Sequence, residues 1–230
     1  MENYRIAKFI ARSGVCSRRE AEKLVAQNIV KVNNKIIVNL ATQVTAVDKV
    51  FIGDKHITIE EKIRVWLYHK RANLITTNND PFCRETIFDD LPKEYTTLKT
   101  VGRLDRQTEG LLVLTNDGEY ARKLELPENK IIREYQVKIF GDSSKTDFRK
   151  LKNGIKIEGV FYKEVDIKID KQEQLNSWLT VKLIEGKNRE IRRIMAFLGF
   201  KVKRLIRVAY GPYKLNDLAK GAIKEVSPLC

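Results

Sequence analysis

The feature that most constrains this chain is a charged turn that leads into a wholly apolar run. The turn carries Arg103, Asp105 and Arg106, and the run is Leu111-Leu112-Val113-Leu114. Because Asn116-Asp117-Gly118 closes the run, the pattern predicts a buried strand that ends in a tight turn. Asp105 then lies in a loop that enters the core directly, where rigid scaffolds present catalytic groups. The commoner alternative is a loop carboxylate paired with Arg103 or Arg106.

The charge of the chain predicts a polyanionic partner. The 230 residues include 44 Lys and Arg against 30 Asp and Glu, a net charge of +14. Nucleic acid is favoured over an anionic membrane because no amphipathic anchor is evident, although charge alone does not distinguish RNA from DNA. No apolar run is long enough to span a bilayer, and the N-terminus lacks the apolar core of a signal peptide. We therefore expect a cytoplasmic protein.

The residues that bind metals and cofactors are sparse. The three cysteines form no C-x-x-C pair, and the chain has only two histidines. A zinc site and a disulfide framework are therefore not expected. The sequence also lacks a P-loop and a dinucleotide-binding glycine pattern. We expect no metal and no cofactor.

The N-terminal segment predicts two helices and a hairpin. Apolar residues at helical spacing form the first helix, which Gly14 ends. Ser17 and Glu20 have the spacing of a capping box that begins the second helix. Two β-forming segments then flank Asn33-Asn34, which is a hairpin signal.

Basic residues are concentrated on these two helices. Residues 1–35 contain eight Lys and Arg against three acids, and most of them avoid the apolar helical face. A solvated surface is the alternative, but clustering on adjacent helices favours contact with RNA phosphates. We expect these contacts at Arg5, Lys8, Arg18 and Arg19.

The same segment resembles an RNA-binding domain of the ribosomal-protein S4 type. The matching residues are Arg5-Ile6-Ala7-Lys8-Phe9-Ile10-Ala11, Gly14, Ser17-Arg18-Arg19-x-Ala21 and Val30-x-Val32-Asn33. Where that family usually has glycines, this chain has Asn28 and Asn34, which tolerate positive φ. We expect this domain over residues 1–60, followed by a second domain over 61–230, with a linker near 55–62.

The rest of the chain predicts a mixed α+β domain whose sheet is mainly antiparallel. Alternating patterns predict strands, and less regular polar patterns predict surface segments. The expected elements are strands at 63–68, 133–139 and 178–183, helices at 120–126 and 142–152, and a polar connection at 170–177.

A basic amphipathic helix follows the last of these strands. An apolar stripe of four residues at helical spacing ends at Gly199, and Asn188 is the expected N-cap. Residues 182–207 contain nine basic residues against two acids. We expect Arg189 and Arg193 to contact the RNA backbone.

The central stretch is similar to the catalytic motif of a family of pseudouridine synthases. Residues 102–118 read Gly-Arg-Leu-Asp-x-x-Thr-x-Gly-Leu-Leu-x-Leu-Thr-Asn-Asp-Gly, as in the family that includes RsuA, RluB, RluE and RluF. The resemblance implies that Asp105 is the essential catalytic residue, with Arg103 at the substrate. Asn79-Asp80-Pro81 and Phe88-Asp89-Asp90-Leu91-Pro92 resemble the RluB branch most closely, which modifies large-subunit ribosomal RNA.

Two further motifs support the same resemblance. Arg133-x-Tyr135-x-Val137 resembles the motif whose tyrosine stacks on the target base, although an inward tyrosine is more often core packing. The segment from Glu185 to Arg193 resembles the third motif. It implies that Arg192 pairs with Asp105 and that Ile191 packs against the base. An arginine beside a carboxylate lowers the pKa of that carboxyl and keeps it ionised.

One element departs from the family pattern. The family commonly has Lys-Pro-x-Gly after the first strand of this domain, and here Lys70 is followed by Arg71 and Asn73 in the Pro and Gly positions. We expect Lys70 to contact RNA.

These residues suit an isomerisation that needs no cofactor. Hydrolysis usually requires a second carboxylate, whereas one carboxylate, an arginine and an aromatic surface fit the conversion of uridine to pseudouridine. The N1–C1′ bond breaks, the uracil rotates, and C5 joins C1′. Three routes are open to Asp105: attack at C1′, removal of the 2′ proton, or addition to the base. The uridine must be flipped out of the helix to reach it.

Two other functions are weighed against this one. A non-catalytic RNA-binding protein for ribosome assembly would be indicated by loss of Asp105, Tyr135 or Arg192, and all three are present. A DNA-binding protein is disfavoured because the chain has no helix-turn-helix or zinc-finger signature. We expect a monomeric synthase that binds ribosomal RNA.

Overall fold

The first residues form a pair of helices because their apolar residues repeat at helical spacing. A computed structural model describes residues 3–59, 62–78, 80–144, 146–173 and 175–229. In it, α1 (Ile6–Arg12) packs against α2 (Arg18–Ala26). Ser17 and Glu20 form the predicted capping box, with each side chain accepting from the other's N–H at 3.3 and 2.8 Å. Gly14 has φ of 76°, so the first helix stops where the sequence predicted.

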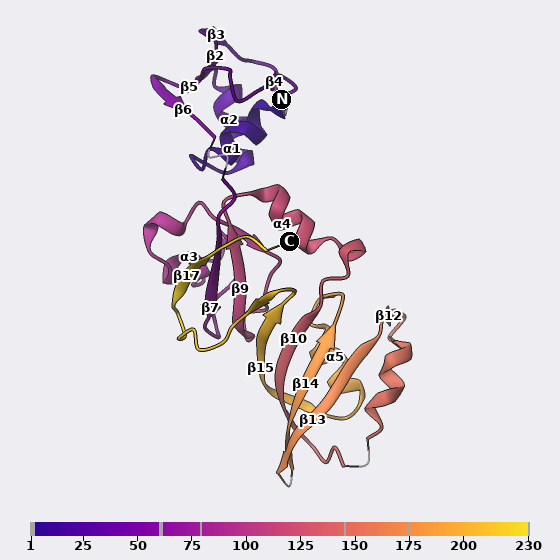
Figure 1. Cartoon of the computed structure of the whole chain (residues 1–230). Helices are drawn as coiled ribbons and strands as arrows, with labels where there is room; N and C mark the ends of the chain where they lie inside the picture. Colours follow the sequence, from indigo (N-terminus) through magenta and orange to yellow (C-terminus); the bar gives the residue numbers. More distant parts are fainter. Residues whose placement is uncertain (1–2, 60–61, 79, 145, 174, 230) are drawn as a thin grey trace.

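Short strands complete the N-terminal domain, which is the upper body in Figure 1. They form a two-stranded sheet, β1–β4, and a four-stranded sheet in the order β3-β2-β5-β6. Asn33 and Asn34 turn the predicted hairpin with φ of 48° and 67°. The strands are β1 (Tyr4–Arg5), β2 (Val30–Val32), β3 (Lys35–Ile36), β4 (Gln43–Val44), β5 (Val50–Ile52) and β6 (Lys55–Ile57).

These elements enclose a core of their own, which includes the side chains of Ile6, Phe9 and Val50. The predicted linker near 55–62 is wrong at its start, because residues 55–57 form β6 and pair with β5. The predicted domain boundary, between residues 60 and 61, lies outside the described residues.

The second domain is built on one mixed sheet. Among the described residues its strands run in the order β13-β14-β10-β15-β9-β7-β17, with β16 paired to β15 and β8 to β9. The pairing of β15 with β9 is parallel and the others are antiparallel, which confirms the predicted class. The strands are β7 (Val65–Lys70), β8 (Lys99–Val101), β9 (Glu109–Thr115), β10 (Arg133–Phe140), β13 (Val165–Glu173), β14 (Asn176–Leu183), β15 (Lys201–Tyr210), β16 (Tyr213–Lys214) and β17 (Ile223–Val226).

Strand β9 lies inside this sheet, as its apolar run predicted. All its residues are buried, and it contacts β7 on one side and β15 on the other. In the parallel pair Arg207 lies opposite Gly110. A Cβ at position 110 would lie 2.3 Å from the carbonyl oxygen of Arg207, so only glycine permits this approach.

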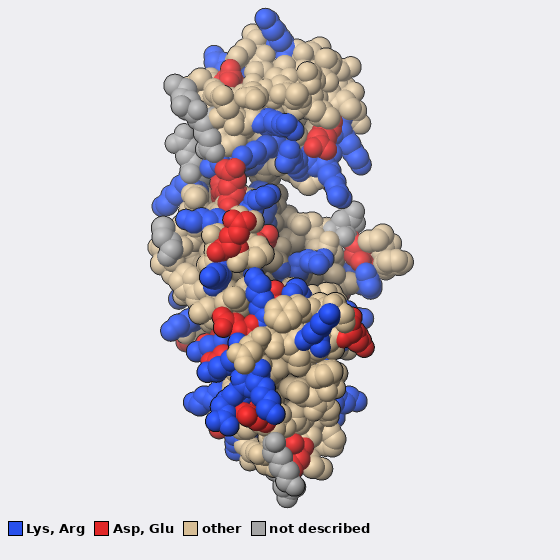
Figure 2. Space-filling model, turned by 90° about the vertical axis from the view of Figure 1, so that its right-hand side faces the viewer, with Lys and Arg blue, Asp and Glu red and all other residues tan. Residues whose placement is uncertain are grey.

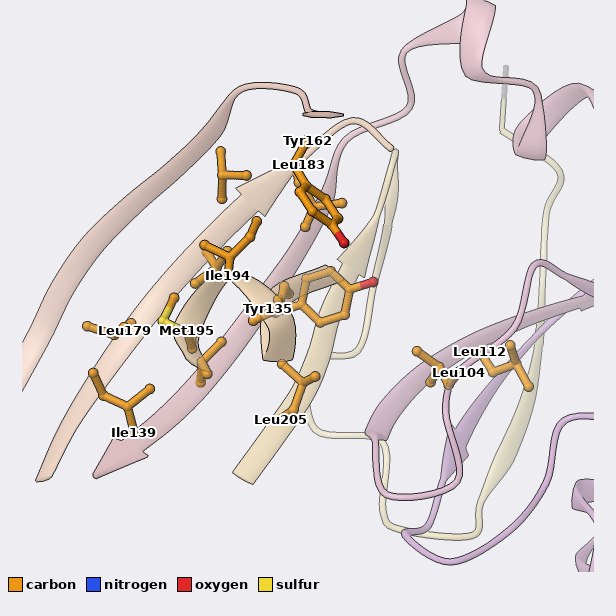
Figure 3. Packing of buried hydrophobic residues seen from close by; sticks show 14 of the residues in the cluster. Leu104, Leu112, Tyr135, Ile139, Tyr162, Leu179, Leu183, Ile194, Met195 and Leu205 are labelled. Carbon is orange, nitrogen blue, oxygen red and sulfur yellow. The ribbon is translucent and has the colours of Figure 1, made fainter. Parts of the chain in front are cut away.

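Helices and short turns cover one face of the part of the sheet around β10 and β14. Residues of α5 and η3 share a buried cluster with the inward side chains of these strands, which Figure 3 shows in part. The remaining elements are α3 (Ile87–Asp90), α4 (Gly118–Glu125), α5 (Glu190–Phe197), β11 (Ile155–Ile157), β12 (Val160–Tyr162) and the 3-10 turns η1 (Lys93–Tyr95), η2 (Pro127–Asn129) and η3 (Phe148–Asn153).

Two expected elements differ in the structure. The helix predicted over 142–152 is only the 3-10 turn η3, because the Asp142 carboxylate accepts from Ser144 and holds a local turn instead. The connection predicted over 170–177 is largely strand, since β13 and β14 continue as a hairpin beyond the apolar part of their pattern.

The N-terminal domain contacts the second domain at the start of α4. The Arg12 guanidinium lies 3.0 Å from the Asp117 carboxylate, which also caps α4 by accepting from two N–H groups. Lys8 pairs with Glu119 in the first turn of the same helix. The Lys99 ammonium donates to the carbonyl of Ala11 at 3.2 Å. Charged side chains therefore join the two domains.

Candidate active site

A cavity of about 660 Å³ opens between the loop that carries Asp105 and the ends of β10, β15 and α5. Its size lies in the range of small-molecule sites, roughly 300–1,000 Å³. Asp105 lines it and is half-buried. The structure thus brings together residues that are far apart in the sequence. Of the residues expected to act on the substrate or to contact RNA, those that line the cavity are Arg103, Asp105, Tyr135, Arg189 and Ile191.

Lys70 holds the backbone of the Asp105 loop. Its side chain is completely buried at the end of β7. The ammonium donates to the carbonyls of Thr108 at 2.9 Å, Arg71 at 3.0 Å, and Asp105 and Arg106 at 3.3 Å. Burial lowers the pKa of Lys70 to about 8, and the negative charges of Asp105 and Glu109 oppose that lowering. The expected RNA contact is wrong for this side chain, because RNA cannot reach a fully buried ammonium.

The segment after Lys70 braces the same loop from another side. The Thr76 hydroxyl donates to the carbonyl of Leu104 at 2.9 Å and accepts from the N–H of Leu104 at 3.3 Å. The N–H of Asn73 donates to the carbonyl of Arg106 at 2.7 Å. Asn73 has φ of 72°, which an asparagine adopts more easily than most residues. Backbone hydrogen bonds therefore hold Asp105 from both flanks.

Tyr135 and Ile191 form an apolar wall of the cavity. Tyr135 projects from β10 and is 8% exposed, while Ile191 lies in the first turn of α5 and is 5% exposed. Figure 3 shows the Tyr135 ring near Leu205, with its hydroxyl pointing toward the part of the molecule that carries Leu104. Tyr135 belongs to the core cluster and also lines the cavity, so one side chain serves both the packing of the core and the wall of the cavity.

Arg192 contacts the Asp105 loop without pairing with its carboxylate. The guanidinium donates to the carbonyl of Gln107 at 3.2 Å and to that of Val202 at 3.4 Å. No ion pair within 4.0 Å joins Arg192 to Asp105, both of which lie in the described part of the chain. Burial and the nearby Arg189 lower the pKa of Arg192, and the negative charge of Asp105 opposes them. The predicted pair is therefore replaced by contacts with backbone carbonyls.

Glu190 was not singled out by its sequence pattern. It is 4% exposed at the start of α5. One carboxylate oxygen accepts from the N–H of Lys187 at 2.9 Å, and the other is buried with no hydrogen-bond partner among the described residues. Burial raises the pKa of Glu190 to about 7. The expected N-cap at Asn188 is wrong, because Arg189 begins the helix with φ of 51° and Glu190 closes the turn before it.

Arg207 was also missed. It lies in β15, is 2% exposed and lines the cavity. Its guanidinium donates to the carbonyl of Leu111 at 2.8 Å and lies 4.9 Å from the centre of the Tyr210 ring. An arginine in an alternating strand would normally face solvent, and only the pairing with β9 buries it.

The remaining basic residues expected at RNA differ in exposure. Arg5, Arg18, Arg19, Arg189 and Arg193 are exposed, whereas Lys8 is half-buried and paired with Glu119 between the domains. Figure 2 shows a hollow below the N-terminal domain, with Lys and Arg side chains above and below it. Asp and Glu side chains also lie beside this hollow, so its border is basic without being uniformly so. No helix in the described part of the chain is long and apolar enough to cross a membrane.

Comparison with known proteins agrees with this geometry. Residues 64–197 match the family model described as RNA pseudouridylate synthase, and residues 5–50 match the S4 domain. An RNA pseudouridine synthase of Rickettsia felis is 43% identical over 226 residues, covering 97% of this chain and 96% of the relative. The ribosomal large subunit pseudouridine synthase B of Pasteurella multocida is 37% identical, covering 98% of this chain and 68% of the relative.

A solved structure supports the fold over the whole length. The crystal structure of a pseudouridylate synthase superposes with a TM-score of 0.68 at 26% identity, covering 97% of this chain and 96% of that one. The family match includes β9, β10 and α5, which carry or adjoin the cavity residues. This chain belongs to the RNA pseudouridylate synthase family and carries an S4 domain at its N-terminal end.

Proposed function

We propose that this synthase converts a specific uridine of ribosomal RNA to pseudouridine, and that the uridine lies in the large-subunit RNA. The observation that carries the proposal is a cavity in which the half-buried Asp105 lies among the lining residues with Tyr135 and Ile191. The large-subunit substrate is suggested by the name of the Pasteurella multocida relative. Localisation in the cytoplasm, action as a monomer and a division into domains 1–60 and 61–230 are parts of the same proposal.

In this proposal Tyr135 and Ile191 bind the base, and Asp105 carries out the chemistry. A flipped uracil stacks on Tyr135 and packs against Ile191, which places C1′ near the Asp105 carboxylate. Asp105 then attacks C1′, removes the 2′ proton or adds to the base. The N1–C1′ bond breaks and C5 bonds to C1′, after which C5 loses its proton to water and N1 takes one up. Uracil delocalises the negative charge that it acquires on leaving, so no second acid is required.

The cations near Asp105 have different tasks in this scheme. Arg103 is exposed at the mouth of the cavity and is placed to bind a phosphate beside the flipped uridine. Arg192 and Lys70 hold the carbonyls of the Asp105 loop and so orient the carboxylate. The exposed arginines Arg5, Arg18 and Arg19 of the S4 domain, with Arg189 and Arg193 of the second domain, contact the flanking RNA backbone.

The test measures tritium release from large-subunit ribosomal RNA that carries tritium at C5 of uridine. The wild type should release tritium from one uridine, mapped by carbodiimide-blocked primer extension. Asp105→Asn keeps the size of the side chain and removes its charge and basicity. Release should fall by about 10³-fold or more. Asp217→Asn, at an exposed position of the same domain, is the matched control and should keep wild-type activity.

Two outcomes would contradict the proposal. Release by Asp105→Asn at the wild-type rate would remove Asp105 from the chemistry. If the wild type instead bound RNA but released no tritium from large-subunit RNA, small-subunit RNA or precursor particles, that result would support the ribosome-assembly alternative.

A further inference from the structure

An exposed aromatic side chain stands at the tip of the loop over residues 76–86. We propose that Phe82, backed by Arg84, stacks on an unpaired base of the substrate RNA close to the target uridine. This inference rests on the proposed function, because it places a second base contact beside the same cavity.

Phe82 is unusual for its exposure. At 75% it is more exposed than any other large apolar side chain in the described part of the chain. Single exposed apolar residues are common on protein surfaces, so exposure alone does not indicate a binding role. A binding role is favoured instead by the contacts through which the loop holds the Phe82 ring.

Arg84 fixes the position of the tip. Its guanidinium lies 5.0 Å from the centre of the Phe82 ring. The same guanidinium donates to both oxygens of Asp80, at 3.0 and 2.6 Å, and the N–H of Arg84 donates to Asp80 at 2.9 Å. Between them, Cys83 has φ of 52°, a left-handed conformation that most residues avoid. The uncommon backbone conformation at Cys83 thus lies directly beside the exposed Phe82.

The neck of the loop is tied to the Asp105 loop. The N–H of Ile75 donates to the carbonyl of Glu85 at 3.0 Å, and the N–H of Ile87 donates to the carbonyl of Ile75 at 2.9 Å. The next residue, Thr76, makes the two hydrogen bonds with Leu104, which precedes Asp105. These hydrogen bonds close the base of the loop, and Thr76 connects that base to Leu104, which lines the cavity.

The reach of this loop matches a short stretch of RNA. The chain from Thr76 to Phe82 extends at most ~20 Å. At ~3.4 Å for each stacked nucleotide, this length corresponds to about six nucleotides of RNA. Enzymes that flip a base act most readily where pairing is already weak, so unpaired bases are expected there.

The chemistry of the tip favours a base over a phosphate. Asp80 neutralises Arg84 through a bidentate pair, which leaves little positive charge to attract the backbone. A phenyl ring with a guanidinium behind it offers a flat, polarisable face, and every base can stack on such a face. The contact is therefore expected to raise affinity without increasing the dependence of binding on salt.

The experiment compares Phe82→Ala, Phe82→Tyr and Phe140→Ala. Phe140 is also an exposed phenylalanine, 43% exposed at the far end of β10, and serves as the matched control. Equilibrium binding is measured on transcribed large-subunit ribosomal RNA and on a blunt RNA duplex, at several salt concentrations. Tritium release from the same ribosomal RNA is measured in parallel, and circular dichroism checks the fold of each variant.

We expect Phe82→Ala to weaken binding to ribosomal RNA by about 5- to 150-fold, the range of one lost base stack. The slope of log affinity against log salt, and the affinity for the duplex, should not change. Phe82→Tyr should remain within about threefold of wild type, as should Phe140→Ala, because the first keeps a stacking ring and the second is far from the cavity.

Wild-type affinity of a folded Phe82→Ala for ribosomal RNA, with tritium release intact, would overturn the inference and leave the proposed function standing. An equal loss on the duplex would also overturn it, since a duplex offers no unpaired base. If the wild type itself released no tritium from large-subunit RNA, small-subunit RNA or precursor particles, the proposed function would fail, and binding would still report whether Phe82 contacts RNA.

Discussion

The cations of the N-terminal domain and those around the Asp105 loop are of the same chemical types but occupy opposite environments. Arg5, Arg18 and Arg19 are exposed on the N-terminal domain. Lys70 and Arg207 are almost completely buried and donate to backbone carbonyls. The comparison therefore separates cations that are available to RNA from cations that shape the site.

The physical reason is the cost of burying a charge. A buried ammonium or guanidinium is tolerated best where hydrogen bonds replace its water. Carbonyls of the Asp105 loop accept from Lys70, and the Leu111 carbonyl in β9 accepts from Arg207, whose Nη2 has no partner among the described residues. Such a cation should affect stability and turnover, with little dependence on salt. An exposed cation that meets phosphates should instead affect affinity, and salt should weaken its contribution.

The largest effect in this comparison is expected from Lys70→Met. Thr108 and Arg71 would each lose a donor to their carbonyls, while the cost of burying the ammonium is recovered. The free energy of unfolding should fall by about 2 kcal/mol, measured by urea unfolding. The rate of tritium release should fall at least tenfold because the loop of Asp105 loses its anchor. The salt slope of RNA binding should stay at the wild-type value.

Lys99→Met provides the matched control. Lys99 is another lysine whose pKa burial lowers, and it donates to the carbonyls of Asn116 and Ala11, away from the Asp105 loop. The Lys99→Met substitution should lower the free energy of unfolding and leave the turnover rate of the RNA-saturated enzyme unchanged. A smaller salt slope of RNA binding in Lys70→Met would show that Lys70 contacts RNA, and would contradict the distinction between buried and exposed cations.

A smaller effect, dependent on pH, is expected from Glu190. Its pKa is about 7 in the folded state, against 4.5 for an ordinary glutamate, so between these values the folded protein holds a proton that the unfolded chain has released. The free energy of unfolding should therefore fall as pH rises from about 4.5 to 7, by about 3 kcal/mol. Glu190→Gln should abolish this part of the slope in thermal unfolding. Glu128→Gln, at an exposed position, should keep it, and a slope unchanged in both would refute the assignment.

The smallest effect is expected from the double variant Arg18→Gln/Arg19→Gln. Both side chains are exposed on α2, and the ion pair of Arg18 with Glu22 is a distant one, at 3.8 Å. Affinity for ribosomal RNA should fall on the order of tenfold at low salt, and the salt slope should decrease by about 1.5. Stability and turnover of bound RNA should be unchanged. An unchanged salt slope of RNA binding would mean that these arginines face solvent and do not contact RNA.

Lys156→Gln/Lys168→Gln is the control for that double variant. These lysines are exposed on β11 and β13, in the second domain. The same loss of charge there should leave the salt slope near its wild-type value. An equal decrease would show that the total charge matters rather than the position of the arginines on α2.

Local patterns predicted much of the fold because their causes are local. The capping box at Ser17, the turn at Asn33 and the buried strand after Asp105 depend on residues within one or two turns of chain. The 142–152 helix and the 170–177 connection were wrong for the opposite reason. Asp142 competes for nearby N–H groups, and the hairpin of β13 and β14 is held by its partner strand rather than by its own apolar pattern.

For the site, the sequence by itself determined the family and the identity of Asp105, Tyr135, Ile191 and Arg103 as cavity residues, because their motifs are contiguous. It could not determine which cations are buried. Whether Lys70, Arg192 and Arg207 are buried depends on which carbonyls lie beside them. Apart from that of Arg71, those carbonyls belong to residues at least ten positions away along the chain. Only tertiary structure brings them together, since the energy of a charge is set by its surroundings in space.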